Sequence, residues 1–232
     1  MRAIDTGKLL IFTAVQMEAR AIGKAFGVAG GIATAPVQLP ITGSIVELCP
    51  IGIRATRMPR HLSPQAVRCI IMTGLAGALD PSLRCGEVVI DGWPTSMPID
   101  RTFRYGAIHT ASQAITTVED KARLHRQTGA LAVDMESDIV RHAAHQLGIP
   151  FVGIRAIGDT AADPVDPVVM TLIDDLGRPK PVALATTLLR HPMLVAHLRR
   201  LQQASALALL ALADALKRLL SGPGPWTMDC RQ

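Results

Sequence analysis

Acidic residues follow two apolar runs of this chain, at positions where a buried strand would end. Asp134 and Glu136 flank Met135 after one run, and Asp159 ends the run that starts at Ile149. Burying a charge without a partner is strongly unfavourable. Such carboxylates are therefore explained by an ion pair, a helix cap or a bound ligand, and the last of these would give the chain a function.

The composition is that of a globular chain with an aliphatic core and a modestly basic surface. The 232 residues are 49% hydrophobic and only 3% aromatic, with a formal net charge of +5. This charge fits simple solubility, an anionic ligand or an anionic membrane surface. Few aromatics and no helix-turn-helix or zinc-finger spacing argue against nucleic acid as a partner.

The cysteines and the N-terminus exclude several other classes. Cys49, Cys69, Cys85 and Cys230 form no C-x-x-C pair, so neither a metal site nor a redox dithiol is indicated, and we expect no cofactor. The apolar stretch 9–15 is too short for a signal peptide. We therefore expect a reducing, cytoplasmic location.

Strand and helix patterns alternate along the chain, which predicts a single three-layer α/β/α domain over residues 1–232. Pro50 is expected to place its strand at an edge or a bulge. Strands are predicted at 8–15, 44–53, 69–73, 87–91, 106–110, 131–135 and 149–157. Helices are predicted at 17–26, 117–127, 137–147, 181–188 and about 193–220, with a short one from Ser63, and turns at 27–31 and 74–77.

The predicted C-terminal helix is unusually apolar. Between Ala204 and Ala213 only Ser205 is polar, yet the segment is too short to cross a bilayer before Asp214. Core packing is the ordinary explanation. The alternatives are that the helix forms an apolar wall of a site for a hydrophobic substrate, or that it contacts a membrane surface.

Four predicted strand ends carry residues suited to ligand binding, and in open α/β sheets ligands sit beyond the carboxyl ends of strands. Each end has a simpler explanation when taken alone: the helix dipole for Glu18 and Glu136, a tight turn for Gly74 and Gly77, an Asx turn for Asp159. Their joint occurrence favours one shared site. The four segments are 13–18, 73–77, 134–136 and 158–159.

Three of these segments resemble signatures of the nucleoside phosphorylase / methylthioadenosine–adenosylhomocysteine nucleosidase superfamily. Residues 132–136 (Ala-Val-Asp-Met-Glu) are similar to its Val-Glu-Met-Glu signature, residues 155–159 (Arg-Ala-Ile-Gly-Asp) to Arg-Ala-Ile-Ser-Asp, and residues 73–77 (Thr-Gly-Leu-Ala-Gly) to its Thr-Gly-Ser-Ala-Gly turn. The similarity covers roughly residues 8–163. It implies a nucleoside phosphorylase-like domain with a central twisted mixed β-sheet.

The resemblance implies an enzyme that cleaves the N-glycosidic bond of a purine nucleoside. Asp159 matches the acid that protonates the leaving purine, Glu136 the acceptor of the ribose hydroxyls, and Glu18 the residue that orients or deprotonates water. Residues 112–117 lie where the family binds the base, but no base-stacking aromatic is evident there. The other matched substrate-binding positions are Met135, which packs on the ribose, and Ala76, Gly77 and Ile115.

Two further charged residues are expected to be structural. On a strand, the side chain of Asp134 would point away from that of Met135, so we assign it no catalytic task. Arg155 is expected to form an ion pair with a neighbouring carboxylate.

The local residues favour water over phosphate as the nucleophile. Phosphorylases of the superfamily place a Gly-Asp-Pro-x-Arg loop after the first strand, where residues 13–17 here read Thr-Ala-Val-Gln-Met. The family's second phosphate arginine and its serine would fall near Met72 and Leu75, whose side chains cannot hold a dianion. Inorganic phosphate stays open as a co-substrate, because Arg54, Arg57 and Arg60 could reach in from a loop or a neighbouring subunit.

The Val-Asp-Met-Glu-Ser variant, the basic charge and the apolar tail most resemble the hopanoid-associated phosphorylase branch. We therefore expect release of adenine, or a related purine, from a nucleoside with a 5′ substituent, with adenosylhopane as the candidate. The resemblance implies a homo-oligomer, and the tail leaves peripheral membrane contact open. The rival classes are a non-catalytic nucleoside-binding module and a peripheral membrane protein.

Overall fold

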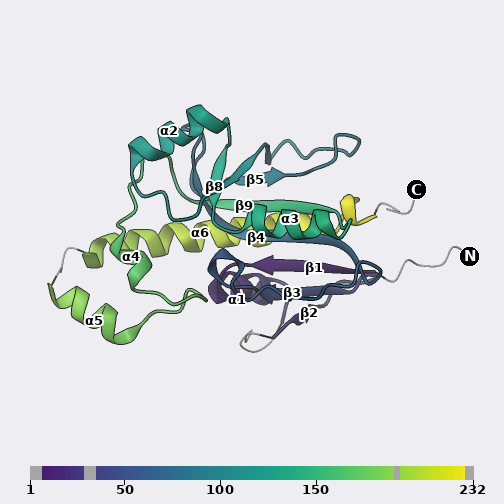
Figure 1. Ribbon diagram of the computed structural model, residues 1–232, viewed down its shortest axis with the longest axis horizontal. Helices are drawn as coiled ribbons and strands as arrows, with labels where there is room; N and C mark the ends of the chain where they lie inside the picture. Colours follow the sequence, from purple (N-terminus) through teal and green to yellow (C-terminus); the bar gives the residue numbers. More distant parts are fainter. Residues whose placement is uncertain (1–6, 29–34, 191–193, 228–232) are drawn as a thin grey trace, which may run out of the picture.

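The computed structural model describes residues 7–28, 35–190 and 194–227, in which nine strands join in one mixed β-sheet (Figure 1). The sheet order is β2-β3-β1-β4-β9-β5-β6, and β8 joins β4 and carries β7. The strands are β1 (Lys8–Thr13), β2 (Val37–Leu39), β3 (Val46–Pro50), β4 (Val67–Ala78), β5 (Val88–Asp91), β6 (Arg104–Tyr105), β7 (Ile108–Thr110), β8 (Ala132–Asp134) and β9 (Phe151–Asp159).

The central strands β3, β1, β4 and β9 run parallel, whereas β2, β5 and β8 pair antiparallel to their neighbours in that set. The central strands are nearly continuous apolar runs because both of their faces are covered. This confirms the predicted α/β fold with a central mixed sheet.

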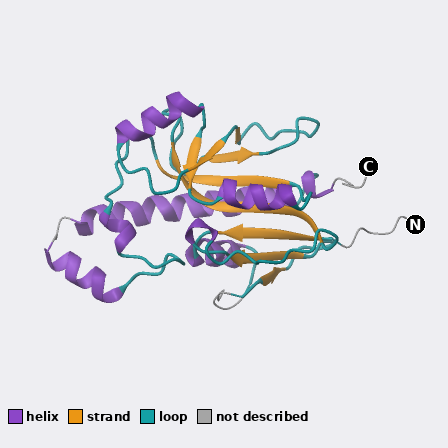
Figure 2. Ribbon diagram, viewed as in Figure 1, coloured by secondary structure: helices purple, strands orange, loops and turns teal. Residues whose placement is uncertain are grey.

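Helices cover both faces of the sheet (Figure 2). On one face Leu9 and Ile11 of β1 lie in a cluster with residues of α1 and α6, and on the other Leu10 and Phe12 lie in a cluster with residues of α3. The alternation of side chains along β1 therefore sorts the core into two layers. The helices are α1 (Gln16–Ala25), α2 (Val118–Thr128), α3 (Ser137–Gln146), α4 (Val168–Thr171), α5 (Pro181–Arg190) and α6 (Leu194–Leu220).

The helix ends show why several predicted boundaries hold to within two residues. Thr117 caps α2, where its hydroxyl accepts a hydrogen bond from the N–H of Asp120 at 3.1 Å. Gly129 ends that helix in the left-handed conformation, with φ 66°. The long C-terminal helix is confirmed from Leu194 onward, while Met193 lies outside the described residues, as do 29–31 of the turn predicted at 27–31.

Three local predictions are wrong. Residues 74–77 do not form a turn: they continue β4, and Gly74 pairs with Arg155 of β9. No helix starts at Ser63, because only three residues separate it from β4 and they form a turn. Strand β3 is neither an edge strand nor bulged, because it pairs on both sides and in register. Pro50 is its last residue and interrupts no bond to β1: the next N–H, that of Ile51, still donates to the Thr13 carbonyl oxygen at 2.8 Å.

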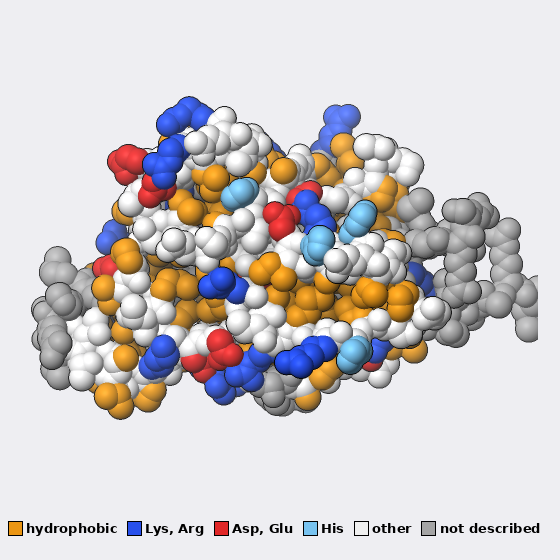
Figure 3. Space-filling model, in the orientation of Figure 1, with side chains coloured by type: hydrophobic (Ala, Val, Ile, Leu, Met, Phe, Trp, Pro, Cys, Tyr) orange, Lys and Arg blue, Asp and Glu red, His pale blue; other side chains and the backbone are white. Residues whose placement is uncertain are grey.

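The C-terminal helix α6 packs along the sheet on its Ala208, Leu212 and Leu216 face. Its opposite face leaves Leu207 and Leu210 exposed. None of the described helices is both long and apolar enough to cross a membrane. On the face seen in Figure 3, Lys and Arg side chains are dispersed among acidic and hydrophobic ones.

Candidate active site

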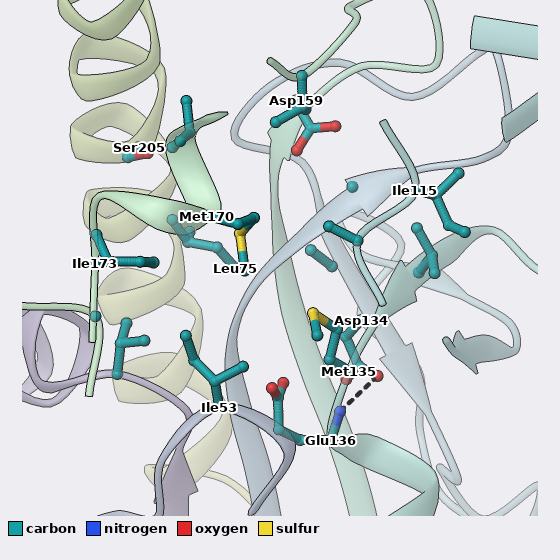
Figure 4. Close-up of a pocket in the computed structure, with 18 of the residues that line it drawn as sticks. Ile53, Leu75, Ile115, Asp134, Met135, Glu136, Asp159, Met170, Ile173 and Ser205 are labelled. Carbon is teal, nitrogen blue, oxygen red and sulfur yellow. Dashed lines mark hydrogen bonds between the residues drawn. The ribbon is translucent and has the colours of Figure 1, made fainter. Parts of the chain in front are cut away.

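A pocket of about 390 Å³ opens at the carboxyl ends of β1, β4 and β9, and its size suits a small organic ligand. The parallel run of these strands brings distant segments of the chain together there. Figure 4 shows Met135 between the carboxylates of Asp159 and Glu136. All seven residues predicted as site residues line this pocket: Glu18, Ala76, Gly77, Ile115, Met135, Glu136 and Asp159.

Glu18 stands in the first turn of α1, almost completely buried. Its Oε2 accepts hydrogen bonds from the N–H groups of Ala14 (3.0 Å) and Val15 (3.1 Å). Its Oε1 accepts one from the N–H of Leu75 at 2.8 Å. Burial raises the pKa of Glu18 to about 7, against the opposing effects of Arg155 and the N–H donors. The carboxylate therefore both caps its own helix and titrates near neutral pH.

Arg155 of β9 is the fully buried cation beneath the pocket. Its Nη2 lies 2.5 Å from Asp134 Oδ2 and 3.4 Å from Glu136 Oε2, which confirms the predicted ion pair. Burial disfavours the charged form of Asp134, but Arg155 and hydrogen bonds from Ser137 outweigh it and hold the pKa of that carboxyl below its usual value. Asp134 also accepts a hydrogen bond from the Ser137 N–H at the start of α3.

Glu136 lies between β8 and α3, at the N-cap position of α3. Its side chain makes no capping hydrogen bond to that helix. Its Oε1 accepts a hydrogen bond from the backbone N–H of Arg54 at 2.9 Å. Arg54 adopts a φ of 58°, in the left-handed region that non-glycine residues seldom occupy. Burial raises the pKa of Glu136, and Arg155 partly opposes that rise. One buried cation thus faces three carboxylates, those of Glu18, Asp134 and Glu136.

Asp159 ends β9 with its side chain 22% exposed, and it forms an ion pair with Lys121, whose side chain is completely buried. Burial raises the pKa of Asp159, while the Lys121 cation acts in the opposite direction. Gly77 of β4 lies directly against this carboxylate, where a Cβ would come within 3.0 Å of Oδ2. A glycine at position 77 therefore leaves the room that Asp159 occupies.

Sequence reasoning missed Lys121, which belongs to none of the recognised motifs. One signal for it was present: it stands on the inward face of α2, at helical spacing from Val118 and Leu124. A lysine on the apolar face of a helix is either exposed, because the predicted face is wrong, or buried with a charged partner.

The far wall of the pocket is apolar and comes mostly from segments that the sequence did not mark as part of a site. α6 contributes Leu201 and Ser205, so its N-terminal half lines the pocket while its middle packs on the sheet. The segment 165–177, which includes α4, was expected only as a loop at 163–167, and its local sequence carries no strong signal. The apolar wall consists of Val15, Met17, Ile53, Val165, Val169, Met170, Ile173 and Leu201.

No arginine or lysine side chain lines the pocket within the described residues, and no aromatic side chain does so. The arginines considered for phosphate, Arg54, Arg57 and Arg60, are exposed. Arg57 pairs instead with Asp175 at 2.7 Å. Met72, near one predicted phosphate position, is a core residue.

Replacing Gly74 by alanine is expected to lower the free energy of unfolding by about 1–3 kcal/mol and to reduce catalysis. Gly74 has a φ of 146°, and a Cβ there would lie 2.5 Å from Glu18 Oε1 and 2.7 Å from Arg155 Nη1. Urea unfolding and steady-state rates measure the two effects. Gly158→Ala is the matched control, because its Cβ would meet nothing closer than 3.7 Å. Equal stability of the two variants would contradict the described packing.

Comparison with known proteins places this pocket in context. Residues 96–188 match the family model described as Phosphorylase superfamily. The 5′-methylthioadenosine/S-adenosylhomocysteine nucleosidase of Staphylococcus aureus (strain JH9) is 28% identical over 161 residues, which are 53% of this chain and 69% of that protein.

Solved structures show the same fold. The corresponding nucleosidase of Campylobacter jejuni aligns with a TM-score of 0.57 and 15% identity, over 92% of this chain and 100% of its own. That of Helicobacter pylori, complexed with a substituted pyrrolidin-3-ol, aligns with a TM-score of 0.56 and 15% identity, over 92% of this chain and 99% of its own. At 15% identity these structures show the fold alone. The partial match to the Phosphorylase superfamily model and the Staphylococcus aureus relative support an enzyme of the nucleosidase or phosphorylase type.

Proposed function

We propose that this protein hydrolyses the N-glycosidic bond of a purine nucleoside that carries an apolar 5′ substituent, and releases adenine or a related purine. The observation that carries the proposal is the convergence of Glu18, Glu136 and Asp159 on one pocket with an apolar far wall. The relatives support cleavage of purine nucleosides in general.

In the proposed reaction the C1′–N9 bond breaks as positive charge develops on the ribose. Asp159 gives its proton to N7 of the purine, which makes the base a better leaving group. Glu136 accepts hydrogen bonds from the 2′- and 3′-hydroxyls, and its negative charge lies near the developing oxocarbenium ion. Met135 packs on the ribose, and Ala76, Gly77 and Ile115 contact the base. With no aromatic side chain in the described lining, base recognition would depend on aliphatic contacts and backbone groups.

Water is the nucleophile in this proposal because the Glu18 carboxylate already occupies the backbone N–H groups that a phosphate ion would need as donors. The N–H groups of Ala14, Val15 and Leu75 all donate to its carboxylate, and no cation lines the described pocket to hold a phosphate. N–H groups clustered in this way are typical ligands of bound anions. A carboxylate with a pKa of about 7 is also well suited to accept a proton from water near neutral pH.

The far wall supports a large apolar group on the 5′ carbon. Its residues come from the start of α1, the turn at Ile53, the segment 165–177 and α6, and apart from Ser205 their side chains are aliphatic or thioether groups. An adenosine with a hydrocarbon 5′ group, adenosylhopane being the candidate, would bury that group against this wall. A homo-oligomer, contact with a membrane surface and a cytoplasmic location stay predictions.

The proposal is tested by product analysis. The protein is incubated with 5′-methylthioadenosine, S-adenosylhomocysteine and an adenosine bearing a long alkyl 5′ group, with and without phosphate, and products are identified by mass spectrometry. We expect free adenine and a free 5′-substituted ribose, with the alkyl substrate preferred. A ribose 1-phosphate product would identify a phosphorylase instead. Nucleoside-dependent thermal stabilisation without base release would identify a binding module.

The pH dependence is expected to report Glu18. When the pH falls through about 7, Glu18 becomes protonated and can no longer accept a proton from water, so kcat/KM should fall by about tenfold per pH unit below that point. Initial rates between pH 5 and 9 measure this. A rate that stays level from pH 8 down to pH 5 would exclude Glu18 as the general base.

A further inference from the structure

Lys121 is a fully buried ammonium group outside the motifs that identify the pocket. Its Nζ donates to Asp159 Oδ2, to the carbonyl oxygen of Thr160 at 2.8 Å and to that of Asp163 at 2.8 Å. These acceptors belong to one short segment, residues 159–163, which directly follows β9. Lys121 thus ties the end of β9 to helix α2.

The number of acceptors indicates that Lys121 is charged. An ammonium group has three N–H donors, and three acceptor oxygens surround Lys121 Nζ. A neutral amine has only two N–H donors and could not donate to all three. A buried ammonium is tolerated only when it is paired and fully hydrogen-bonded. The site therefore keeps a full positive charge next to one oxygen of Asp159.

The other charged and titratable groups near this pair are accounted for. The carboxylate of Asp163 interacts electrostatically with both Lys121 and Asp159, and its Oδ2 accepts hydrogen bonds from the Thr160 N–H at 3.0 Å and the Thr160 hydroxyl at 2.6 Å. Arg200 of α6 also interacts electrostatically with Asp163, and Cys85, which precedes β5, interacts with both Asp159 and Asp163. Lys121 is the cation in direct contact with Asp159 among the described residues.

We propose that Lys121 is the positioning residue for Asp159: it holds Oδ2, leaves Oδ1 to meet the purine, and stabilises the carboxylate that forms when the proton has left. This inference rests on the proposed function. Within the described chain, the one hydrogen bond to the Asp159 carboxyl is that from Lys121 to Oδ2, so Oδ1 is free for substrate.

The step balances without any further reactant. The proton passes from Asp159 Oδ1 to N7, the C1′–N9 electron pair moves into the purine, and Asp159 becomes a carboxylate. Its new negative charge lies beside the Lys121 ammonium, so the attraction between the two groups is stronger after proton transfer than before it. An interaction that strengthens along the reaction accelerates it. Burial raises the pKa of Asp159 and so favours its protonated form, whereas Lys121 acts in the opposite direction and favours the carboxylate.

A merely structural role is the alternative, in which Lys121 only secures the backbone of residues 159–163. The two roles differ in what happens to Asp159 when the charge is removed. Without Lys121 the carboxylate loses its counter-ion, so the pKa of Asp159 should rise by about 1–3 pH units. A purely structural lysine would leave the titration of Asp159 where it is.

The test is the Lys121→Met variant, with Lys8→Met as its control. Lys8 also pairs with a carboxylate, Glu47 at 2.8 Å, but at the opposite end of β1. Carbon-13 NMR of labelled aspartate carboxyls follows Asp159, whose signal is assigned by its loss in Asp159→Asn. In Lys121→Met we expect the pKa of Asp159 to rise, kcat to fall by about 10²-fold, KM to change little, and the alkaline limb of kcat to move to higher pH.

Further variants make the result decisive. Lys121→Gln, which keeps hydrogen-bond donors without the charge, should show the same rise in the pKa of Asp159 even if the methionine variant folds poorly. In an Asp159→Asn background, Lys121→Met should lower kcat little further, because both changes act on one group. An unmoved Asp159 titration in both Lys121 variants of an active enzyme overturns the inference. A shifted titration in a protein that releases no base would instead overturn the proposed function.

Discussion

Asp159→Asn is expected to lower kcat by about 10²–10⁴-fold, the contribution of a well-placed general acid, while the protein keeps its fold. Asparagine preserves the size and shape of the side chain but has no acidic proton for N7. The loss should appear in kcat more than in KM, because the proton moves only as the bond breaks. Steady-state rates of adenine release measure it.

The matched control for this variant is Asp138→Asn. Asp138 stands in the first turn of α3, and its side chain is 53% exposed. That variant should keep nearly full activity. Circular dichroism and urea unfolding of both variants separate chemistry from stability. Turnover of Asp159→Asn at the wild-type rate would remove Asp159 from the mechanism.

Glu18→Gln should lower the water-dependent rate by about 10²–10⁴-fold and abolish the acidic limb near pH 7. Glutamine can still accept the Leu75 N–H through its carbonyl oxygen, but it cannot take a proton from water. The amide is also neutral, so it no longer repels an incoming anion. Rates with and without phosphate therefore show at the same time whether Glu18 activates water and whether its charge excludes phosphate.

Glu119→Gln is the control for this second variant, because Glu119 occupies the first turn of α2 as Glu18 occupies that of α1. Any effect of removing a carboxylate from a helix start is common to both. Loss of activity confined to Glu18→Gln would support the general-base role. Unchanged hydrolysis in Glu18→Gln, or equal losses in both variants, would leave another group to activate the water.

Much of the fold was readable from local sequence. The apolar runs of β1 and β9, the Thr117 cap and the Gly129 stop all act through neighbouring residues, so their patterns predict the elements closely. The wrong predictions concern short local segments, but tertiary contacts explain why they failed. Residues 74–77 have the composition of a turn, yet pairing with β9 keeps them extended, because the ladder hydrogen bonds outweigh the conformational freedom of two glycines.

The pocket divides in the same way between sequence and tertiary structure. The chain by itself determined which carboxylates end strands, since the short motifs around Glu136 and Asp159 carry them at definite positions. Only the tertiary structure decided their partners. Lys121 meets Asp159 from 38 positions away, and Glu18 accepts the N–H of Leu75 across 57. Strand order and helix packing decide which distant groups meet, and the free energy of a buried charge depends on that meeting.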